Sequence, residues 1–376
     1  MKGFVKKAFA AVMVMALAVG MMTGCSTSKD LKTQNGNKVL FTYDNTEATL
    51  KEAWIYAKME AEQYNSYYGM MYGSDFWLSP MGMDAEGKSI TFESYVKQQI
   101  INKMKMIMVL NNKAEELGIS LTEEEKTECA DFAKKFAETE QGAAILKECG
   151  AGESDMAKIY EQNKIASKVQ QKEVEDVDTE VSDDEARVTT ISRIVYKTTK
   201  TDDDGNTVDM TDAEKAETLK KAELDLKKIQ DGTELAKVAE AAEFTNTSES
   251  YGAGQSEEGE AFEKKIAGMK DGDLMGEVME CANGYVIAQL NAYTDAEATK
   301  TSKENIVAQR QQDAFAQIYQ EWIKDLEADW DYAKSVDQAL WDEVVLHSEE
   351  STATDAVEET APAEDTSAAE ATTAAK

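Results

Sequence analysis

Histidine and proline are scarce in this chain of 376 residues, which contains one histidine and two prolines. The single histidine, His347, stands beside the C-terminal tail, which leaves no further histidine for a Ser/His/Asp or Cys/His catalytic arrangement or for a multi-histidine metal site. We therefore expect no metal and no cofactor. Because the only prolines are Pro80 and Pro362, long stretches of the chain are free to form helices.

Basic residues are also few, since 40 Lys and Arg stand against 73 Asp and Glu and the formal net charge is −33. A surface of this charge repels phosphate, which excludes nucleic acid and anionic lipid as partners. The composition is otherwise globular, with 42% apolar and 30% charged residues, and the length suffices for two or three domains.

The N-terminus has the pattern of a targeting segment. Three lysines precede an apolar run at residues 8–20, which is too short to cross a hydrocarbon core of about 30 Å, so we interpret residues 1–24 as a signal peptide. The run Met22-Thr23-Gly24-Cys25 resembles the bacterial lipobox, and this resemblance implies that Cys25 is lipidated and begins the mature protein. The alternative is an ordinary secretory signal that happens to end near a cysteine.

On the lipoprotein interpretation, the mature protein lies at the extracytoplasmic face of the cell membrane and is held there by its own lipid. Cys129, Cys149 and Cys281 then remain, an odd number without a recognisable spacing. A bridge between Cys129 and Cys149 is conceivable, but buried free thiols are the favoured interpretation.

Composition and periodicity divide the rest of the chain. Residues 25–36 are polar and predict a tether, and residues 37–181 predict a helical domain. In that domain a helix is expected from residue 49 to about residue 68, a second helix follows the apolar spacing of residues 100–117, and Thr122 and Glu125 have the spacing of a capping box. Residues 295–348 predict a returning helix, and residues 349–376 are an acidic, Ala/Thr-rich stretch with too little apolar mass to order itself.

Residues 182–294 have a different pattern, in which strand and helix signals alternate. A strand is expected at residues 187–199, a turn at 202–206, helices at 211–230, 234–242 and 262–269, and a loop at 245–260. Asn283-Gly284 between two β-prone runs predicts a hairpin. The predicted fold class is α+β.

Two sets of motifs resemble one family. Residues 101–125, with Ala114-x-x-Leu117-Gly118-Ile119 before the predicted capping box, resemble the N-terminal helical segment of SurA- and PrsA-type extracytoplasmic foldases. Residues 187–199, 262–265, 270–273 and 284–287 resemble the parvulin peptidyl-prolyl isomerase domain. The resemblance implies a helical chaperone domain completed by the C-terminal helix, with a parvulin-like domain inserted between them.

The parvulin signature positions are mostly substituted. Arg193 stands where the family has a histidine in the first strand, and Val286 stands in place of the second histidine. Thr247 falls near the usual Cys or Asp, Glu258 falls at the methionine of the proline pocket, and only Phe262 keeps the family's pocket aromatic. Because such changes upset the polar network and the apolar proline seat, the resemblance implies a site with weak or absent isomerase activity.

A separate candidate site lies in a run of aromatic residues and methionines. Tyr and Met suit promiscuous binding surfaces, since Tyr has an apolar face with a hydroxyl and Met repacks readily. We expect an exposed, adaptable patch that binds clients, and the open alternative is a helical core with a covering loop. The candidate client-binding residues are Tyr67, Met70, Met71, Tyr72, Phe76 and Trp77.

The sequence thus favours a lipid-anchored extracytoplasmic folding factor whose partners are unfolded or newly secreted polypeptides. One alternative is an active parvulin-type isomerase. Another is a non-catalytic surface lipoprotein, such as a solute-binding or envelope-structural component.

Overall fold

A computed structural model describes residues 35–83, 87, 89–244, 247–282 and 284–347. The predicted signal peptide, Cys25, most of the predicted tether and the predicted tail lie outside the described residues. The chain divides into two units: unit 1 combines the residues up to 173 with those from 318 onward, and unit 2 is residues 174–317. Helices and small antiparallel sheets occur together, so the predicted α+β class is confirmed.

Unit 1 begins with an antiparallel hairpin of β1 (Val39–Tyr43) and β2 (Thr46–Thr49), which the sequence analysis did not predict. Asp44 and Asn45 make its turn with positive φ, a conformation that short polar side chains tolerate. Thr49 then caps α1 (Leu50–Tyr72) in a capping box with Glu52. This helix passes through Gly69 and so ends four residues later than predicted; a 3₁₀ turn, η3 (Ser74–Leu78), and a ribbon of β3 (Pro80–Met83) and β4 (Ser89–Thr91) follow.

The remaining helices of unit 1 follow the predicted signals up to residue 328, whereas the single helix predicted over residues 295–348 is interrupted after Ala328 and continues as two short helices. These remaining helices are α2 (Phe92–Glu116), α3 (Glu123–Glu138), α4 (Glu140–Glu148), α5 (Glu153–Glu173), the C-terminal part of α10 (Ala296–Ala328), α11 (Tyr332–Ser335) and α12 (Gln338–Trp341). The capping box of Thr122 and Glu125 at the start of α3 is confirmed. Buried apolar residues of α2 recur at positions 100, 104, 107 and 110, as their spacing predicted.

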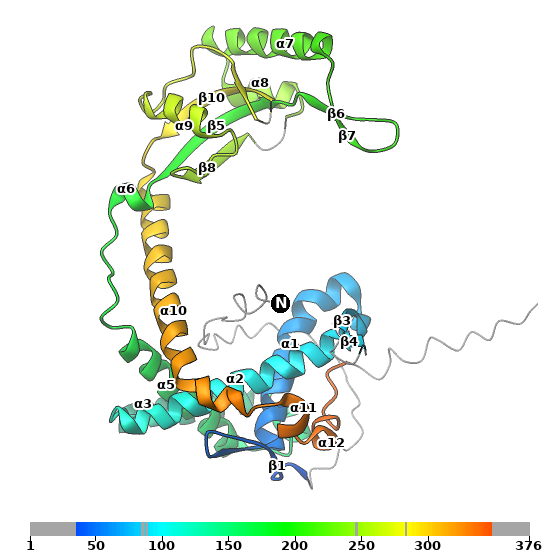
Figure 1. Ribbon diagram of the computed structural model, residues 1–376, viewed down its shortest axis with the longest axis vertical. Helices are drawn as coiled ribbons and strands as arrows, with labels where there is room; N and C mark the ends of the chain where they lie inside the picture. The colour runs from blue at the N-terminus through cyan, green and yellow to red at the C-terminus, as the bar shows by residue number, and fades with distance from the viewer. Residues whose placement is uncertain (1–34, 84–86, 88, 245–246, 283, 348–376) are drawn as a thin grey trace, which may run out of the picture. The chain divides into compact units, whose positions relative to one another are not determined.

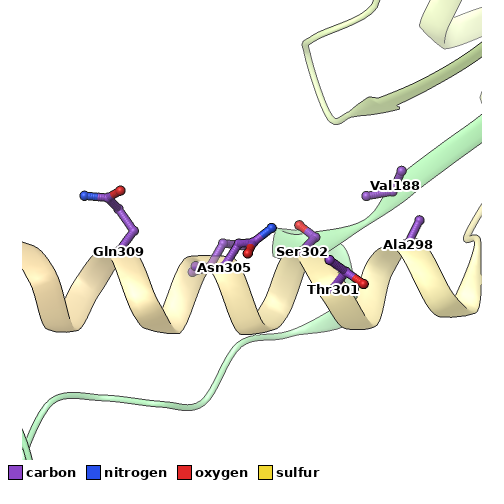
Figure 2. A pocket seen from close by; sticks show the side chains of 7 residues that line it. Val188, Ala298, Thr301, Ser302, Asn305 and Gln309 are labelled. Carbon is purple, nitrogen blue, oxygen red and sulfur yellow. The ribbon is translucent and has the colours of Figure 1, made fainter. Parts of the chain in front are cut away.

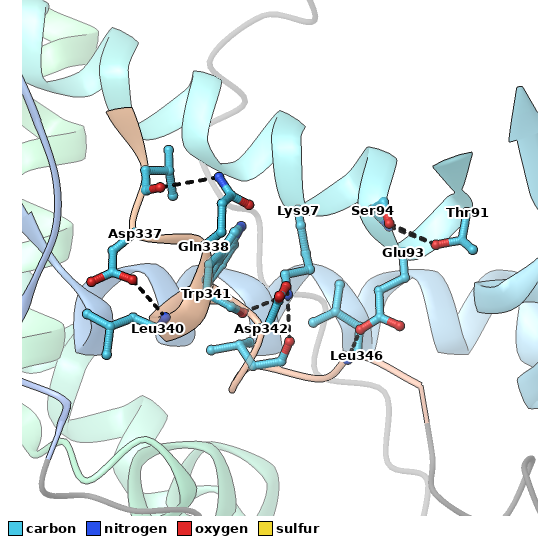
Figure 3. A network of polar contacts seen from close by, with 12 residues as sticks. Thr91, Glu93, Ser94, Lys97, Asp337, Gln338, Leu340, Trp341, Asp342 and Leu346 are labelled. Carbon is cyan, nitrogen blue, oxygen red and sulfur yellow. Dashed lines mark hydrogen bonds and ion pairs between the residues drawn. The ribbon is translucent and has the colours of Figure 1, made fainter. Parts of the chain in front are cut away.

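The C-terminal segment completes unit 1 by binding α2 and β1 (Figure 3). Lys97 donates to the carbonyls of Trp341 and Val344 at 2.6 and 2.9 Å, and the Leu346 N–H donates to Glu93 at 2.7 Å. The Asp337 N–H donates to the Leu40 carbonyl of β1 at 2.9 Å. These bonds satisfy backbone groups of an irregular segment that would otherwise be buried without partners.

A buried lysine makes a second connection in unit 1. The Lys105 ammonium lies 4.5 Å from the ring centre of Tyr43 and 4.2 Å from that of Trp330, and it pairs with Glu327 at 2.5 Å. Burial lowers the pKa of Lys105, although Glu327 opposes that shift. The two rings and one carboxylate compensate the ammonium for its lost hydration, so Lys105 connects β1, α2 and the end of α10.

Unit 2 is built on a four-stranded antiparallel sheet of strand order β8-β5-β10-β9. The strands are β5 (Val188–Tyr196), β8 (Ser248–Gly252), β9 (Met279–Cys281) and β10 (Gly284–Ala292). The predicted hairpin at Asn283-Gly284 is confirmed by the pairing of β9 with β10. β8 lies in the segment predicted as a loop, so that part of the prediction was wrong.

Helices cover both faces of this sheet (Figure 1). Ile194 and Ile287 pack against α7 (Asp212–Gln230) and α8 (Leu235–Ala241) on one face. Ile191 and Val286 pack against α9 (Glu260–Ala267) on the other. The short helix α6 (Asp183–Ala186), the ribbon of β6 (Thr199–Thr201) and β7 (Thr207–Asp209), and the N-terminal part of α10 complete the unit.

Candidate functional site

The residues that the sequence analysis compared with the parvulin site converge on the sheet face that α9 covers. Arg193 lies on β5 and is only 3% exposed. Its backbone N–H donates to the Thr247 carbonyl at 2.8 Å. Thr247 therefore contributes its backbone to this contact. Phe262 of α9 and Val286 of β10 are both 0% exposed and belong to the same core cluster. Sequence positions far apart are thus brought to one region.

The centre of this region is an ion cluster around the Arg193 guanidinium. It pairs with the buried Glu258, with Glu249 of β8 at 2.9 Å and with the mostly exposed Glu257 at 2.9 Å. Ser256 donates its hydroxyl to the second carboxylate oxygen of Glu258 at 2.9 Å. Arg193 and Glu258 would each be unfavourable alone in an apolar pocket, but here their opposite charges compensate one another.

The cluster contains three carboxylates and one guanidinium, and this excess of negative charge shifts the pKa values of its members. Burial, the hydrogen bond with Glu258 and the charge of that carboxylate raise the pKa of Glu249 to about 7, although Arg193 opposes the shift. Desolvation alone would lower the pKa of Arg193, but the hydrogen bond to Glu257 and the charges of Glu258 and Glu249 raise it overall. Arg193 therefore stays charged, and Glu249 exchanges its proton near neutral pH.

These positions offer little surface to a substrate. An X-Pro isomerase must hold a proline ring and a twisted amide in a pocket, which requires accessible apolar walls. The retained aromatic, Phe262, is instead wholly covered by the core, and the group at the pocket methionine position is a paired carboxylate. The arrangement stabilises the sheet and α9.

The candidate client-binding residues divide into two layers. Tyr67, Met71 and Tyr72 are 68%, 65% and 61% exposed at the C-terminal end of α1. Phe76 and Trp77 of η3 are buried, so the expectation that they belong to an exposed patch was wrong. Met70 lies on α1, but its side chain is outside the described part of the chain.

The second layer is an aromatic cluster in which Phe76 and Trp77 are buried and Tyr64, Tyr68 and Phe92 are half-buried. Its ring centres lie 4.8 to 6.2 Å apart, in the tilted and edge-on arrangements that aromatic rings favour. The Trp77 indole N–H donates to Asn65 of α1 at 2.9 Å. Phe92 begins α2, so the cluster fixes η3 between α1 and α2 and holds the exposed residues in place.

Further apolar side chains extend the exposed layer. Leu78 at the end of η3 and Met81 and Met83 on β3 are all exposed. We call the exposed apolar side chains of α1, η3 and β3 the Tyr/Met patch; they are Tyr67, Met71, Tyr72, Leu78, Met81 and Met83. Leu78, Met81 and Met83 were not among the predicted client-binding residues.

A groove of about 530 Å³ lies along α10 within unit 2 (Figure 2). Its lining is uncharged, with Val188 of β5 facing a stripe of α10 that includes Ser302, Asn305, Ile306 and Gln309. Across the described residues, no group of three or more His, Cys, Asp or Glu side chains is placed to hold a metal ion. In the same part of the chain, no helix is both long and apolar enough to cross a membrane.

Comparison with known proteins gives structural likenesses. No family model and no curated protein matches the chain. The fold is similar to the peptidylprolyl isomerase PrsA from Bacillus cereus, with 18% identity over 71% of this chain and 97% of that one and a TM-score of 0.30. It is also similar to the foldase protein PrsA from Streptococcus pneumoniae, with 17% identity over 70% and 98% of the two chains and a TM-score of 0.25.

A SurA-like chaperone structure from Campylobacter jejuni is similar as well, with 12% identity over 78% of this chain and 97% of that one and a TM-score of 0.26. The assignment of function rests on this chain's own residues.

Proposed function

We propose that this chain is a lipid-anchored extracytoplasmic folding factor that binds unfolded or newly secreted polypeptides through unit 1. The observation that supports the proposal is the Tyr/Met patch, in which the exposed Tyr67 and Tyr72 contact Tyr68 of the aromatic cluster. Single exposed apolar residues are common, but several on consecutive elements mark an interaction surface.

The chemistry of the patch suits partners of many sequences. Met71, Met81 and Met83 have flexible, polarisable side chains that adapt to different apolar groups. Tyr67 and Tyr72 add flat apolar faces and hydroxyls that can bond a peptide backbone. Such a surface binds many apolar segments weakly, which is what a folding factor requires.

In the same proposal, unit 2 is a parvulin-like domain with little or no isomerase activity. Arg193 and Glu258, at two of the positions compared with the parvulin site, are joined with Glu249 in an ion cluster, and Phe262 is covered. This burial favours the inactive interpretation over the active isomerase.

The first experiment separates the two layers of the candidate site. The combined change Tyr67→Ser, Met71→Ser and Tyr72→Ser is expected to abolish most suppression of aggregation of an unfolded secreted protein. The unfolding midpoint of unit 1 should barely move, because exposed substitutions usually change stability by less than about 0.5 kcal/mol each. Trp77→Ala should instead lower the stability of unit 1 by about 3 to 5 kcal/mol, since it empties a buried site.

The matched control for the patch is another pair of exposed apolar side chains, Phe132 of α3 and Leu224 of α7. Phe132→Ser and Leu224→Ser should leave aggregation suppression intact. Equal loss of activity in the control would show that general surface hydrophobicity is responsible, and full activity of the patch variant would remove these residues from the client site.

The second experiment measures whether the mature chain accelerates cis-trans isomerisation of a proline peptide. No acceleration above the uncatalysed rate is expected. A robust rate that persists through purification of the chain would establish the active isomerase.

A further inference from the structure

The charges around the Tyr/Met patch indicate which clients it prefers. The sequence contains no lysine or arginine between Lys58 and Lys88, the stretch that supplies the whole patch. The exposed charged residues described within the patch segment, Glu62 of α1 and Asp75 of η3, are both acidic. Within its described residues, the segment that supplies the patch therefore combines exposed apolar side chains with charge of one sign, which is negative.

The neighbouring cations do not offset these carboxylates. Lys51 and Lys58 of α1 pair with Asp155 and Glu148 at 3.3 and 2.7 Å. In the first half of α2, Lys103 pairs with Glu60 at 2.7 Å, and the Lys97 ammonium donates to two backbone carbonyls of the C-terminal segment. Each lysine of α1 and of this half of α2 is thus held in a contact elsewhere.

The exposed tyrosines add a second attraction for cations. Tyr67 and Tyr72 are more than half exposed, and a Lys or Arg side chain placed over an accessible tyrosine ring gains a cation–π interaction. The net charge of −33 also steers positively charged partners toward the chain and slows the approach of acidic ones.

We infer that the Tyr/Met patch selects apolar polypeptide segments flanked by lysine or arginine. The inference rests on the proposed function, because it names the class of client that the same patch binds. Acidic unfolded segments are disfavoured by the negative charge of Glu62 and Asp75 on the same segment, whereas basic ones are attracted by it and gain aromatic contacts with Tyr67 and Tyr72.

The test uses the mature chain and three short fluorescent peptides with one apolar core, flanked by lysines, glutamines or glutamates. At low salt the lysine peptide should bind about five- to tenfold more tightly than the glutamate peptide, a modest ratio because exposed ion pairs contribute little. The ratio should shrink at high salt. The change Glu62→Lys with Asp75→Lys should abolish or reverse the preference.

The matched control reverses two exposed glutamates of α7, Glu217→Lys and Glu223→Lys, which changes the net charge equally. The control should keep the preference. Equal binding of the three peptides, or an equal effect of the control, would overturn this inference while leaving the proposed client site in place. Absence of binding by all three peptides, or binding unaffected by the patch serines, would refute the proposed function and this inference with it.

Discussion

Replacing Arg193 by methionine removes the one cation of the unit 2 ion cluster while keeping most of its apolar volume. Three carboxylates lose their ion-pair partner, among them Glu258, whose side chain is fully buried. Removing one member of a buried ion pair costs about 3 to 5 kcal/mol, because the remaining charge is left without compensation. We expect a loss of that size for unit 2 at pH 8.

The loss should depend on pH in a defined direction. Arg193 opposes the raised pKa of Glu249, so without Arg193 that pKa rises further above its unfolded value and the folded state binds more protons than the unfolded state. Stability is then retained at low pH and lost as the pH rises through the folded pKa. The variant should therefore approach wild-type stability near pH 5 and fall away from it toward pH 8.

The distribution of tryptophan makes the measurement specific. All five tryptophans, at positions 54, 77, 322, 330 and 341, belong to unit 1, so their emission reports on that unit alone. Hydrogen exchange of the paired amides of β5 and β10 reports on unit 2. Denaturant series read by both methods will separate a local loss from a general one.

A second variant tests the same ion pair if Arg193→Met does not fold. Arg193→Met combined with Glu258→Met removes the buried pair together, and replacement of a whole buried ion pair by apolar groups is often neutral. The double variant should recover at least half of the loss. A loss below about 1 kcal/mol in the single variant, no pH dependence, or an equal shift of the tryptophan signal would refute the role assigned to the cluster.

Four further predictions follow from other residues. In the wild type, Glu249 has a pKa of about 7, raised above its ordinary value, so the stability of unit 2 should fall as the pH rises from about 5 to 8, and Glu249→Gln should flatten that slope in hydrogen exchange. Lys105→Ala should lower the tryptophan-reported stability of unit 1 by about 2 kcal/mol or more, and Lys105→Met by less, because Met retains the stem between the two rings. Gly284→Ala should destabilise unit 2 markedly in the same exchange assay, since φ is 133° and an added Cβ would lie 2.1 Å from the Tyr196 carbonyl oxygen. Cys25→Ala should release the protein from membranes, and retention of that variant at high salt would contradict lipid anchoring.

Local signals predicted most of the helices and the best hairpin. Thr122 and Glu125 form a capping box within four residues at the start of α3. The prediction of this helix start therefore does not depend on the rest of the chain. Asn283-Gly284 is equally local, because the positive φ of Gly284 lets β10 begin directly after the turn. Features set by neighbouring residues can be derived from a sequence.

Features set by distant partners could not be derived in this way. Trp77 is buried because Phe92 of α2 packs 5.5 Å from it and Asn65 accepts its N–H, and no periodicity within η3 shows either partner. β8 carries a single fully buried side chain, Tyr251, so its sequence looks like a polar loop. Its strand conformation depends on pairing with β5.

The candidate site in unit 2 shows the same division. The sequence identified Arg193 and Glu258 as substitutions at family positions, and each by itself predicted an upset pocket. Only the fold brings them into one ion pair and covers Phe262. Arg193 and Glu258 are each unfavourable alone but compatible as a pair. A comparison with the family made one position at a time cannot show this coupling.

The C-terminal segment bound to α2 has a consequence for the order in which the protein is made. Glu93 receives the Leu346 N–H from a residue 253 positions later, so unit 1 stays incomplete until almost the whole described chain has been synthesised. Unit 2 ends at residue 317 and has all its strands before then. The contacts of α2 and β1 with the C-terminal segment therefore become possible only after every strand of unit 2 has been synthesised. A chain that stopped before Asp337 would leave Lys97, Glu93 and the Leu40 carbonyl without these partners, so the last described residues decide whether unit 1 is complete.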